Sequence, residues 1–253
     1  MLMEITFLGT GTSSGVPVVG CECIVCRSDN TKDRRLRSSV LIEKDGVRLL
    51  IDVTPDFREQ MLGLTFTKID GVLITHEHYD HVGGLDDLRP FGRFGEISIY
   101  AENNVSDALM NRIPYCFMKN KYSDIPNLRI TDIDCAPFQI EGIDIIPIRV
   151  MHHKLPILGF RIDDFAYLTD VKTIPTEELD KLKGLSVLVV SALRRSEHIS
   201  HQNLDQAIAL IHKIDAKETY LTHISHEMGL HDEVQQELDR RVNIAFDGLK
   251  ISV

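Results

Sequence analysis

The segment Thr75–Gly84 holds the densest group of side chains that could bind a metal. It reads Thr-His-Glu-His-Tyr-Asp-His-Val-Gly-Gly and follows a short apolar run. Because alternate residues of an extended backbone share a face, His76 and His78 can point to one ion. Asp80 and His81 come where the chain turns, so they can reach a second ion. Neutral imidazole and carboxylate suit Zn²⁺, Mn²⁺ or Fe²⁺, so this segment predicts a divalent metal site.

Several other apolar runs also end in a side chain that could be a ligand. Reactive groups are often placed where rigid strands give way to loops. The residues at these ends are Asp52, His152, Asp170 and His223. His152 and His153 are adjacent, so they face opposite sides of a strand. The residues that follow favour His152 as the ligand and leave His153 as the alternative.

Short β-branched runs alternate with helical patterns along the chain, and these elements must position the ligands. The predicted strands are Met3–Leu8, Ser39–Glu43, Val47–Asp52, Gly71–Thr75, Ser98–Ala101, Ile143–Met151, Gly159–Ile162, Phe165–Thr169, Ser186–Ser191, Glu218–Thr222 and Asn243–Val253. The predicted helices are Asp56–Leu62, Gly84–Phe91, Val105–Arg112, Thr176–Lys183, Leu204–Ile214 and Asp232–Arg240. Some strands are joined by hairpin-length loops and others by helices, which favours two mixed sheets packed face to face with helices outside.

The composition is that of a globular protein, with 43% apolar and 26% charged residues in 253 positions. No linker or repeat divides the chain, so residues 1–253 are expected to form one domain. The net charge of −10 argues against non-specific coating of nucleic acid, which needs an excess of Lys and Arg. The chain start lacks the basic and apolar regions of a signal peptide, and the longest apolar run is too short to cross a bilayer. We therefore expect a cytoplasmic protein with no membrane partner.

The pattern His-x-His-x-Asp-His, followed by Gly-Gly-Leu, resembles the metallo-β-lactamase superfamily. The resemblance implies an α/β fold, the αββα sandwich, with a metal site at one edge of its two sheets. The first ion would be held by His76, His78 and His152, the second by Asp80, His81 and His223, and Asp170 would bridge them. The cofactors implied are two divalent ions, Zn²⁺ or Mn²⁺.

Two further segments resemble the phosphodiesterase branch of this superfamily, which includes ribonuclease Z. Phe7–Pro17 is glycine-rich but is not a P-loop, because no Gly-Lys-Ser/Thr follows. In His198–Ala207, His201 looks like the family histidine that serves the scissile phosphate, with His198 as the alternative. Asp80 could also orient the attacking hydroxide, so the expected catalytic residues are Asp80 and His201.

Three cysteines crowd into a short segment at Cys21, Cys23 and Cys26. Cysteines this close rarely form relaxed disulfides with each other, whereas three thiolates and one more ligand would complete a tetrahedral zinc site. The segment resembles the extra zinc site of phosphoribosyl cyclic phosphodiesterases, enzymes of bacterial phosphonate breakdown. In that group the fourth ligand is a histidine three residues after the last active-site histidine. This implies a structural Zn²⁺ with His226 as its fourth ligand.

The resemblance implies a dinuclear phosphodiesterase that hydrolyses a small cyclic phosphodiester such as a ribose cyclic phosphate. Asp52 and Thr75 could orient ligand imidazoles from behind. The candidate phosphate contacts are Arg89, Arg194 and Arg195, which could equally be surface ion pairs.

Three other functions stay open. A tRNA 3′-processing endonuclease usually carries a long basic arm, whereas the aromatic and basic stretch Tyr115–Tyr122 is short and suits an active-site flap or a dimer contact. The sequence therefore argues against nucleic acid as a partner, and a homodimer is an expectation from resemblance alone. A thioester or lactone hydrolase of the same fold would need neither His201 nor the cysteines. A metal-binding protein without catalysis would leave the candidate acid unexplained.

Overall fold

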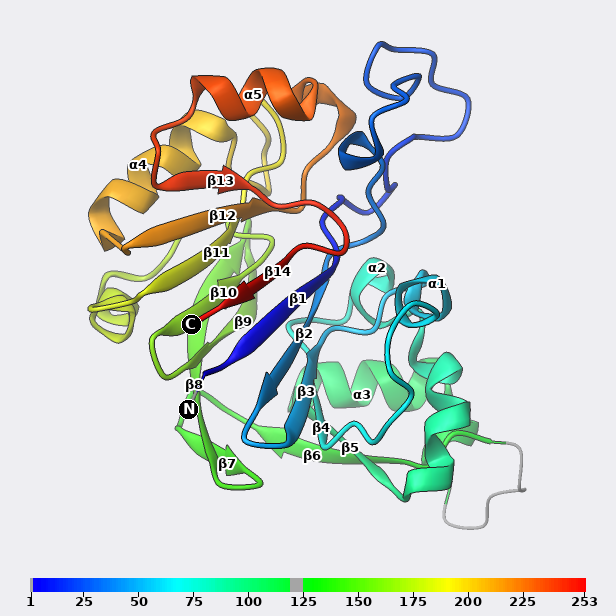
Figure 1. Ribbon diagram of the computed structural model, residues 1–253. Coiled ribbons are helices and arrows are strands. Elements are labelled where there is room, and N and C mark those ends of the chain that lie inside the picture. Colours follow the sequence, from blue (N-terminus) through cyan, green and yellow to red (C-terminus); the bar gives the residue numbers. More distant parts are fainter. Residues whose placement is uncertain (1, 119–124) are drawn as a thin grey trace.

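Two seven-stranded β-sheets pack face to face in the computed structural model, which describes residues 2–118 and 125–253 (Figure 1). The first sheet has the order β14-β1-β2-β3-β4-β5-β6 and the second β13-β12-β11-β10-β9-β8-β7. The strands of the first are β1 (Glu4–Gly9), β2 (Ser39–Lys44), β3 (Val47–Ile51), β4 (Gly71–Leu73), β5 (Ile97–Glu102), β6 (Leu128–Ile133) and β14 (Lys250–Ser252). Those of the second are β7 (Phe138–Ile140), β8 (Ile143–His152), β9 (Leu155–Ile162), β10 (Phe165–Leu168), β11 (Val187–Ser191), β12 (Glu218–Thr222) and β13 (Val242–Ile244).

Helices cover the outer face of each sheet. The first sheet is covered by α1 (Phe57–Met61), the 3₁₀ helix η2 (Leu85–Phe94) and α3 (Asn103–Arg112). The second is covered by η4 (Thr176–Leu182), α4 (Leu204–Ile214) and α5 (His231–Glu237). The shorter elements are η1 (Thr31–Asp33), α2 (Tyr79–Val82), η3 (Pro114–Phe117) and η5 (His226–Met228). The layers are helices, sheet, sheet and helices, so the predicted αββα fold is confirmed.

Both faces of the central strands are buried, which explains their uninterrupted apolar runs. In β3, Leu49 and Ile51 face the core between the sheets, and Leu50 faces the helices outside. In β11, Val189 faces the inner core and Val190 packs under the helices of the second sheet. Each such side chain stabilises the fold by roughly 1.5–3 kcal/mol, which makes the strand ends a rigid support.

The structure corrects several predicted elements. Asn243–Val253 is not one strand: β13 pairs with β12 in the second sheet, and β14 pairs with β1 in the first. A turn at residues 246–249 carries the chain across, with the Leu249 amide donating to the Phe246 carbonyl at 3.1 Å. The edge strands β6 and β7 were not predicted, because polar residues interrupt their apolar patterns.

The predicted helix at Gly84–Phe91 is the 3₁₀ helix η2, which contains Pro90, a residue without an amide donor for an α-helical bond. The predicted helix at Thr176–Lys183 is likewise the 3₁₀ helix η4. Of the aromatic and basic stretch Tyr115–Tyr122, the part up to Phe117 lies in η3, and residues 119–122 lie outside the described residues.

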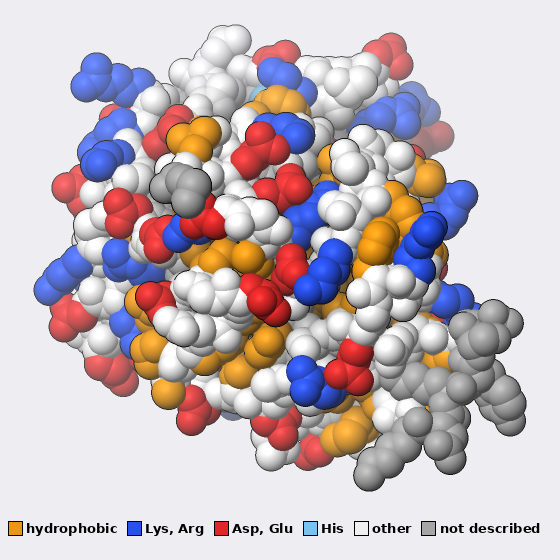
Figure 2. Space-filling view, turned by 60° about the horizontal axis from the view of Figure 1, so that its bottom comes forward, with side chains coloured by type: hydrophobic (Ala, Val, Ile, Leu, Met, Phe, Trp, Pro, Cys, Tyr) orange, Lys and Arg blue, Asp and Glu red, His pale blue; other side chains and the backbone are white. Residues whose placement is uncertain are grey.

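Charges of both signs are interspersed on the face shown in Figure 2, with no continuous basic surface among the residues coloured there. Within residues 2–118 and 125–253, no helix combines the length and the apolar character that crossing a bilayer requires.

Candidate metal centre and active site

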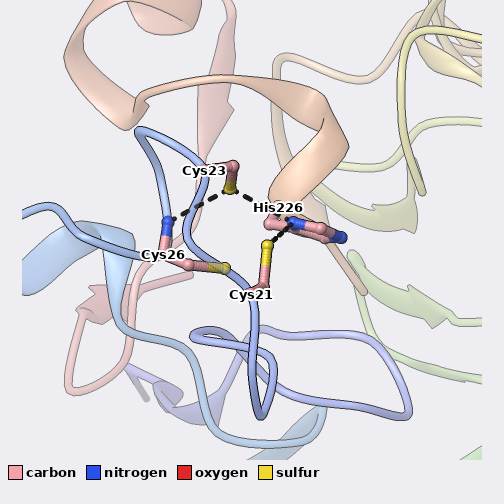
Figure 3. Close-up of side chains that lie close together, drawn as sticks. All are labelled: Cys21, Cys23, Cys26 and His226. Atoms are coloured by element: carbon pink, nitrogen blue, oxygen red, sulfur yellow. Dashed lines mark hydrogen bonds between the residues drawn. The ribbon is translucent and has the colours of Figure 1, made fainter.

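The cysteine segment and His226 meet although they are far apart in the sequence (Figure 3). The Sγ atoms of Cys21 and Cys23 each lie 3.3 Å from His226 Nδ1. The four donor atoms, with Cys26 Sγ included, all lie within 4.8 Å of one another. A tetrahedral zinc ion, with Zn–S of about 2.3 Å and Zn–N of about 2.0 Å, places its sulfur and nitrogen ligands roughly 3.5 Å apart. The four side chains therefore fit one such ion.

The thiol of Cys23 is already prepared for metal binding. The Cys26 amide and the His226 side chain lower its pKa to about 6. A thiolate is the form that binds zinc, so this ligand is ionised near neutral pH.

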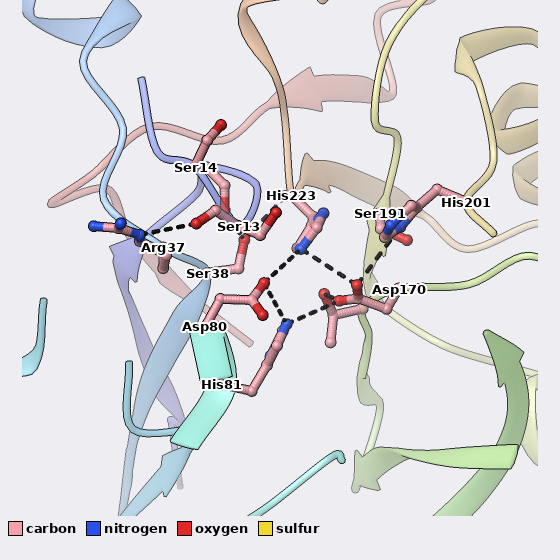
Figure 4. Close-up of polar contacts among 12 residues, drawn as sticks. Ser13, Ser14, Arg37, Ser38, Asp80, His81, Asp170, Ser191, His201 and His223 are labelled. Atoms are coloured by element: carbon pink, nitrogen blue, oxygen red, sulfur yellow. Dashed lines mark hydrogen bonds and ion pairs between the residues drawn. The ribbon is translucent and has the colours of Figure 1, made fainter. Parts of the chain in front are cut away.

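The main cluster of predicted ligands lies at one edge of the sandwich, where strands of both sheets end. Asp52 follows β3 and the segment Thr75–His81 follows β4, both in the first sheet. His152 ends β8, while Asp170 and His223 come just after β10 and β12 in the second sheet. Figure 4 shows Asp80, His81, Asp170, His201 and His223 pointing toward one another from these different elements.

Three of these residues adopt a left-handed backbone conformation. The φ angles of Asp52, Asp170 and His223 are 64°, 55° and 56°. Residues other than glycine rarely occupy this region, and such positions concentrate at functional sites. In each case the chain turns sharply at the end of the strand, and the side chain points back toward the shared edge.

The donor atoms form three overlapping groups, each within 4.8 Å: His76, His81 and Asp170; Asp80, His81 and His223; and His152, Asp170 and His201. His81 Nε2 lies 3.2 Å from Asp170 Oδ2 and 3.3 Å from Asp80 Oδ2. His223 Nε2 lies 3.3 Å from Asp170 Oδ1. Asp170 thus belongs to two of the three groups and lies beside two histidines of the other, His81 and His223.

His78 lies at the rim of the cluster and belongs to none of these three groups. Its side chain is exposed, and its ring centroid lies 4.6 Å from that of His76 and 5.1 Å from that of His152. It therefore flanks the two histidines with which it is expected to share an ion.

Several buried nitrogens of the cluster lack a hydrogen-bond partner among the described residues. They include Nε2 of His76, Nε2 of His81 and both ring nitrogens of His223. All three side chains are about 1% exposed. Buried polar atoms without a partner are rare in folded proteins. Unpaired imidazole nitrogens grouped around a carboxylate are what a divalent metal requires.

The opposite nitrogens of these rings are held in place. His81 Nδ1 lies 2.7 Å from Asp52 Oδ2, and His76 Nδ1 lies 3.0 Å from Thr75 Oγ1. The Thr75 hydroxyl itself donates to Asp52 at 2.8 Å. This network places a proton on Nδ1 of each histidine and leaves the lone pair of Nε2 facing the cluster. Asp52 and Thr75 thus occupy the supporting positions expected for them.

The charges of the cluster favour metal-binding protonation states at Asp170, Asp80 and His76, whereas at His81 the carboxylates of Asp170 and Asp52 outweigh burial and raise the pKa well above its usual value. Burial opposes ionisation of Asp170, but His223 and His81 hold its pKa well below the usual range. Burial also opposes ionisation of Asp80, but His81 and His223 outweigh it and lower the pKa of this carboxyl. Burial lowers the pKa of His76 well below its usual value. Ionised carboxylates and a neutral imidazole are the forms that coordinate a cation.

His201 faces the cluster from the second sheet. Its Nδ1 lies 3.5 Å from Asp170 Oδ1, and its ring centroid lies 4.6 Å from that of His152. Burial and the neighbouring His223 lower its pKa to about 3. The alternative, His198, lies behind it with ring centroids 5.0 Å apart, and its Nδ1 accepts from the Ser200 amide.

The structure likewise separates His152 from His153. His152 is 8% exposed, and its Nδ1 contacts the Asp170 carbonyl at 3.1 Å and the Ser200 carbonyl at 3.0 Å. His153 lies exposed in the turn between β8 and β9, with a φ angle of 56°. Of the two histidines, His152 is the one that lies in the cluster.

Each predicted phosphate contact is held by an acidic neighbour. Arg89 pairs with Asp86 at 2.6 Å, Arg194 with Glu227 at 2.7 Å, and Arg195 with Glu237 at 2.8 Å. These are the surface ion pairs that the sequence left as the alternative.

Sequence reasoning missed the hydroxyl residues around the cluster. Ser38 donates to the Gly11 carbonyl at 2.9 Å and accepts from the His223 amide at 3.1 Å, so it fixes the backbone of a candidate ligand. Arg37 Nε donates to the Ser13 carbonyl at 3.1 Å, as Figure 4 shows. A serine inside an apolar strand or a polar loop carries no distinguishing pattern in the sequence.

Residues 47–224 match the family model described as the β-lactamase superfamily domain. The chain belongs to this superfamily. The superfamily fold, with the cluster described above, indicates a metal-dependent hydrolase. The predicted resemblance to this family is therefore confirmed.

Several solved structures resemble the chain over nearly its whole length. A diphosphatase of the PhnP family is 39% identical and has a TM-score of 0.94. The match covers 100% of this chain and 98% of the diphosphatase. Zinc-bound PqqB from Methylobacterium extorquens has a TM-score of 0.81 at 19% identity, over 99% of this chain and 100% of that one. The short form of human tRNase Z has a TM-score of 0.72, also at 19% identity, with 99% of each chain covered. The last two show the shared fold alone.

Curated relatives are longer than this chain. An octanoyltransferase of Porphyromonas gingivalis is 46% identical over 251 residues, which are 98% of this chain and 51% of that protein. The coenzyme PQQ synthesis protein B of Methylobacterium nodulans is 34% identical over 126 residues, which are 44% of this chain and 41% of that protein. The chain thus spans about half the length of the octanoyltransferase. The name of that protein describes the whole of it, including a half that this chain does not match.

Proposed function

We propose that this protein is a dinuclear-metal hydrolase of phosphorus–oxygen bonds in small molecules, with a cyclic phosphodiester such as a ribose cyclic phosphate as its substrate. The observation that carries the proposal is the position of His201 beside Asp170. It adds a proton donor to a cluster of metal ligands, and a phosphodiester with an alkoxide leaving group needs both. The 39% identity to a PhnP-family diphosphatase along the whole chain supports phosphorus chemistry.

In this proposal one ion would be held by His76, His78 and His152, the other would be held by Asp80, His81 and His223, and Asp170 would serve both. When bound, two divalent ions lower the pKa of water toward neutrality and offset the charge of the phosphate. Which metal binds depends on the metals available in the cell as well as on the ligands. Zn²⁺ and Mn²⁺ both suit this set of histidines and aspartates.

The protein's own residues direct the reaction. Asp80 orients the attacking hydroxide, whose oxygen forms a bond to phosphorus while the opposite P–O bond breaks. The protonated imidazole of His201 gives its proton to the leaving alkoxide. The pKa of His201 is about 3 without substrate, and the negative phosphodiester raises it by favouring the imidazolium. Asp52 keeps His81 in the tautomer that can bind metal.

The cysteine site has a supporting role in the proposal. Cys21, Cys23, Cys26 and His226 would bind one structural Zn²⁺. His226 comes three residues after His223, and the intervening Ile224 forms a bridge with Gly11. The ion would therefore fasten the loop between β1 and β2 to the chain segment that carries the candidate ligand His223.

Two other substrate classes are favoured by particular relatives. The PhnP-family neighbour favours a substituted diphosphate, whose leaving phosphate needs less help from a proton donor. The name of the P. gingivalis octanoyltransferase, of which this chain matches 51%, keeps a thioester, the acyl alternative of the same fold, among the substrates to be tested. A precursor tRNA is the third alternative, and its binding should weaken steeply with salt.

The proposal is tested by offering all four substrates to protein reconstituted with Mn²⁺ or Zn²⁺. We expect hydrolysis of the five-membered ribose cyclic phosphate, its loss in Asp170→Ala, and its retention in Asp180→Ala, a matched acid whose side chain is 78% exposed. The proposal would be contradicted if the protein hydrolysed the thioester or the tRNA but neither the ribose cyclic phosphate nor the diphosphate. Turnover of the diphosphate alone would keep the phosphorus chemistry and reject the cyclic substrate.

A further inference from the structure

The candidate acid His201 lies on a loop, residues 198–203, that is bound to the second sheet by its backbone. The Gln202 amide donates to the Val171 carbonyl at 2.9 Å, and the Leu193 amide donates to the Gln202 carbonyl at 3.0 Å. The Ser200 carbonyl contacts His152 Nδ1 at 3.0 Å. The position of the His201 imidazole therefore depends on backbone contacts of its loop.

Lys172 also holds this loop, through three hydrogen bonds of its side chain. Its Nζ donates to the His198 carbonyl at 2.7 Å, to the His201 carbonyl at 3.1 Å and to Gln206 Oε1 at 3.1 Å. An ammonium group has three protons, and all three are used. Gln206 also forms the capping box at the start of α4 with Asn203. One side chain thus joins the end of β10, both ends of the His198–His201 segment and the first turn of α4.

The partners of Lys172 are unusual for a lysine that is not fully exposed. Five other lysines, Lys44, Lys68, Lys181, Lys183 and Lys250, form ion pairs with carboxylates. Among the described residues, Lys172 has no carboxylate within 4.0 Å. Its acceptors are two backbone carbonyls and an amide oxygen. Hydrogen bonds from a charged donor are stronger than neutral ones, so the cation is suited to holding a loop that lacks regular structure.

We propose that Lys172 is a positioning residue for proton transfer by His201. By fixing the carbonyls at both ends of the His198–His201 segment, it keeps the imidazole directed at Asp170 and at the leaving oxygen of a bound substrate. This inference rests on the proposed function, in which His201 is the proton donor. A displacement of about 1 Å at a catalytic group can cost roughly 100-fold in rate.

The contacts that place Asp170 do not involve Lys172. The Thr169 hydroxyl donates to Asp170 Oδ2 at 2.7 Å, and the Val171 amide donates to Ser191 Oγ at 3.0 Å. Loss of the lysine side chain should therefore leave the metal ligands in place and affect His201 selectively.

The test compares Lys172→Met with Lys172→Arg, and uses Lys183→Met as a control because Lys183 is 78% exposed. Each metal-loaded protein is assayed on the ribose cyclic phosphate, which leaves as an alkoxide, and on bis(4-nitrophenyl) phosphate, whose aryl leaving group needs no proton. For Lys172→Met we expect kcat to fall roughly 10- to 100-fold on the first substrate and less than about threefold on the second, with KM and metal content unchanged. Lys172→Arg should recover part of the loss.

Amide hydrogen exchange supplies a readout that is independent of activity. In Lys172→Met the amides of residues 198–203 should exchange faster than in the wild type, and those of β12 should not. Equal losses on both substrates, or unchanged exchange in the loop, would overturn the positioning role. If Lys172→Met does not fold, Gln206→Leu removes one of the three acceptors and should shift both readouts in the same direction. Wild-type protein that hydrolyses neither diester would instead reject the proposed function, while hydrogen exchange still decides whether Lys172 holds the loop.

Discussion

Asp52→Asn should weaken binding at one metal site without unfolding the protein. Asp52 is fully buried, and its carboxylate accepts from His81 Nδ1 at 2.7 Å, from the Thr75 hydroxyl at 2.8 Å and from the Thr75 amide at 2.9 Å. Asparagine has the same shape but only one acceptor oxygen. If that oxygen keeps the Thr75 amide, the NH₂ group faces His81 Nδ1. Two donors cannot face each other, so the proton of His81 moves to Nε2.

The expected size of the effect follows from this tautomer change. Nε2 is the His81 atom that faces Asp80 and Asp170, and a protonated Nε2 has no lone pair for a metal. Removing such a supporting partner typically weakens metal binding by about 10- to 100-fold, or about 1.4–2.7 kcal/mol. Asp52 contacts His81 directly but reaches His76 only through Thr75, so the ion assigned to His76 should be affected less.

Competition with a chromophoric chelator would measure both affinities, and ¹⁵N NMR of the histidine rings would report the tautomer. Asp70→Asn is the matched control, because Asp70 accepts from the Arg48 amide at 2.8 Å just before β4, at the end of that strand opposite Thr75. Wild-type affinity for both ions in Asp52→Asn, with His81 still protonated on Nδ1, would refute the reasoning.

Three other predictions follow from the same geometry. His201→Gln should lower kcat by about 100-fold or more on substrates with alkoxide leaving groups while both ions stay bound, and metal loss measured by elemental analysis would show instead that His201 is a ligand. Cys23→Ser should release one zinc per chain and make residues 12–30 more sensitive to limited proteolysis; unchanged zinc content would exclude the cysteine site. Burial and Arg35 lower the pKa of His231 to about 4, so the unfolded chain binds a proton that the native state does not between about pH 4 and 6.5. The metal-free protein should therefore lose up to about 3 kcal/mol of stability as the pH falls through this range, and urea unfolding of His231→Gln should show a shallower pH dependence.

The candidate ligands could be predicted from the sequence because their signal is local. An apolar run that ends in histidine or aspartate is visible in a few residues, and its recurrence at Thr75–His81, His152, Asp170 and His223 indicates a shared edge. Buried strands with apolar residues on both faces are predictable for the same reason.

Contacts between distant or backbone atoms could not be predicted in this way. Nothing in Asn243–Val253 shows that its two halves pair with strands of different sheets. The pairing of Arg194 with Glu227 depends on how the loop after β11 packs against η5. The carbonyl contacts of Lys172 involve groups that every residue carries. The left-handed backbone conformation of Asp170 and His223 could not be predicted either, because neither residue is a glycine.

The central claim is that the histidine and aspartate cluster binds metal and uses it to break a phosphorus–oxygen bond. The most direct measurement is a titration of metal-free protein with Mn²⁺ while hydrolysis of the five-membered ribose cyclic phosphate is followed, with His78→Ala alongside. The account predicts that turnover rises with metal, saturates once both active-site ions are bound, and is absent or strongly reduced in the variant. Wild-type protein that binds both ions and yet leaves the cyclic phosphate intact, or a variant as active as the wild type, would contradict it.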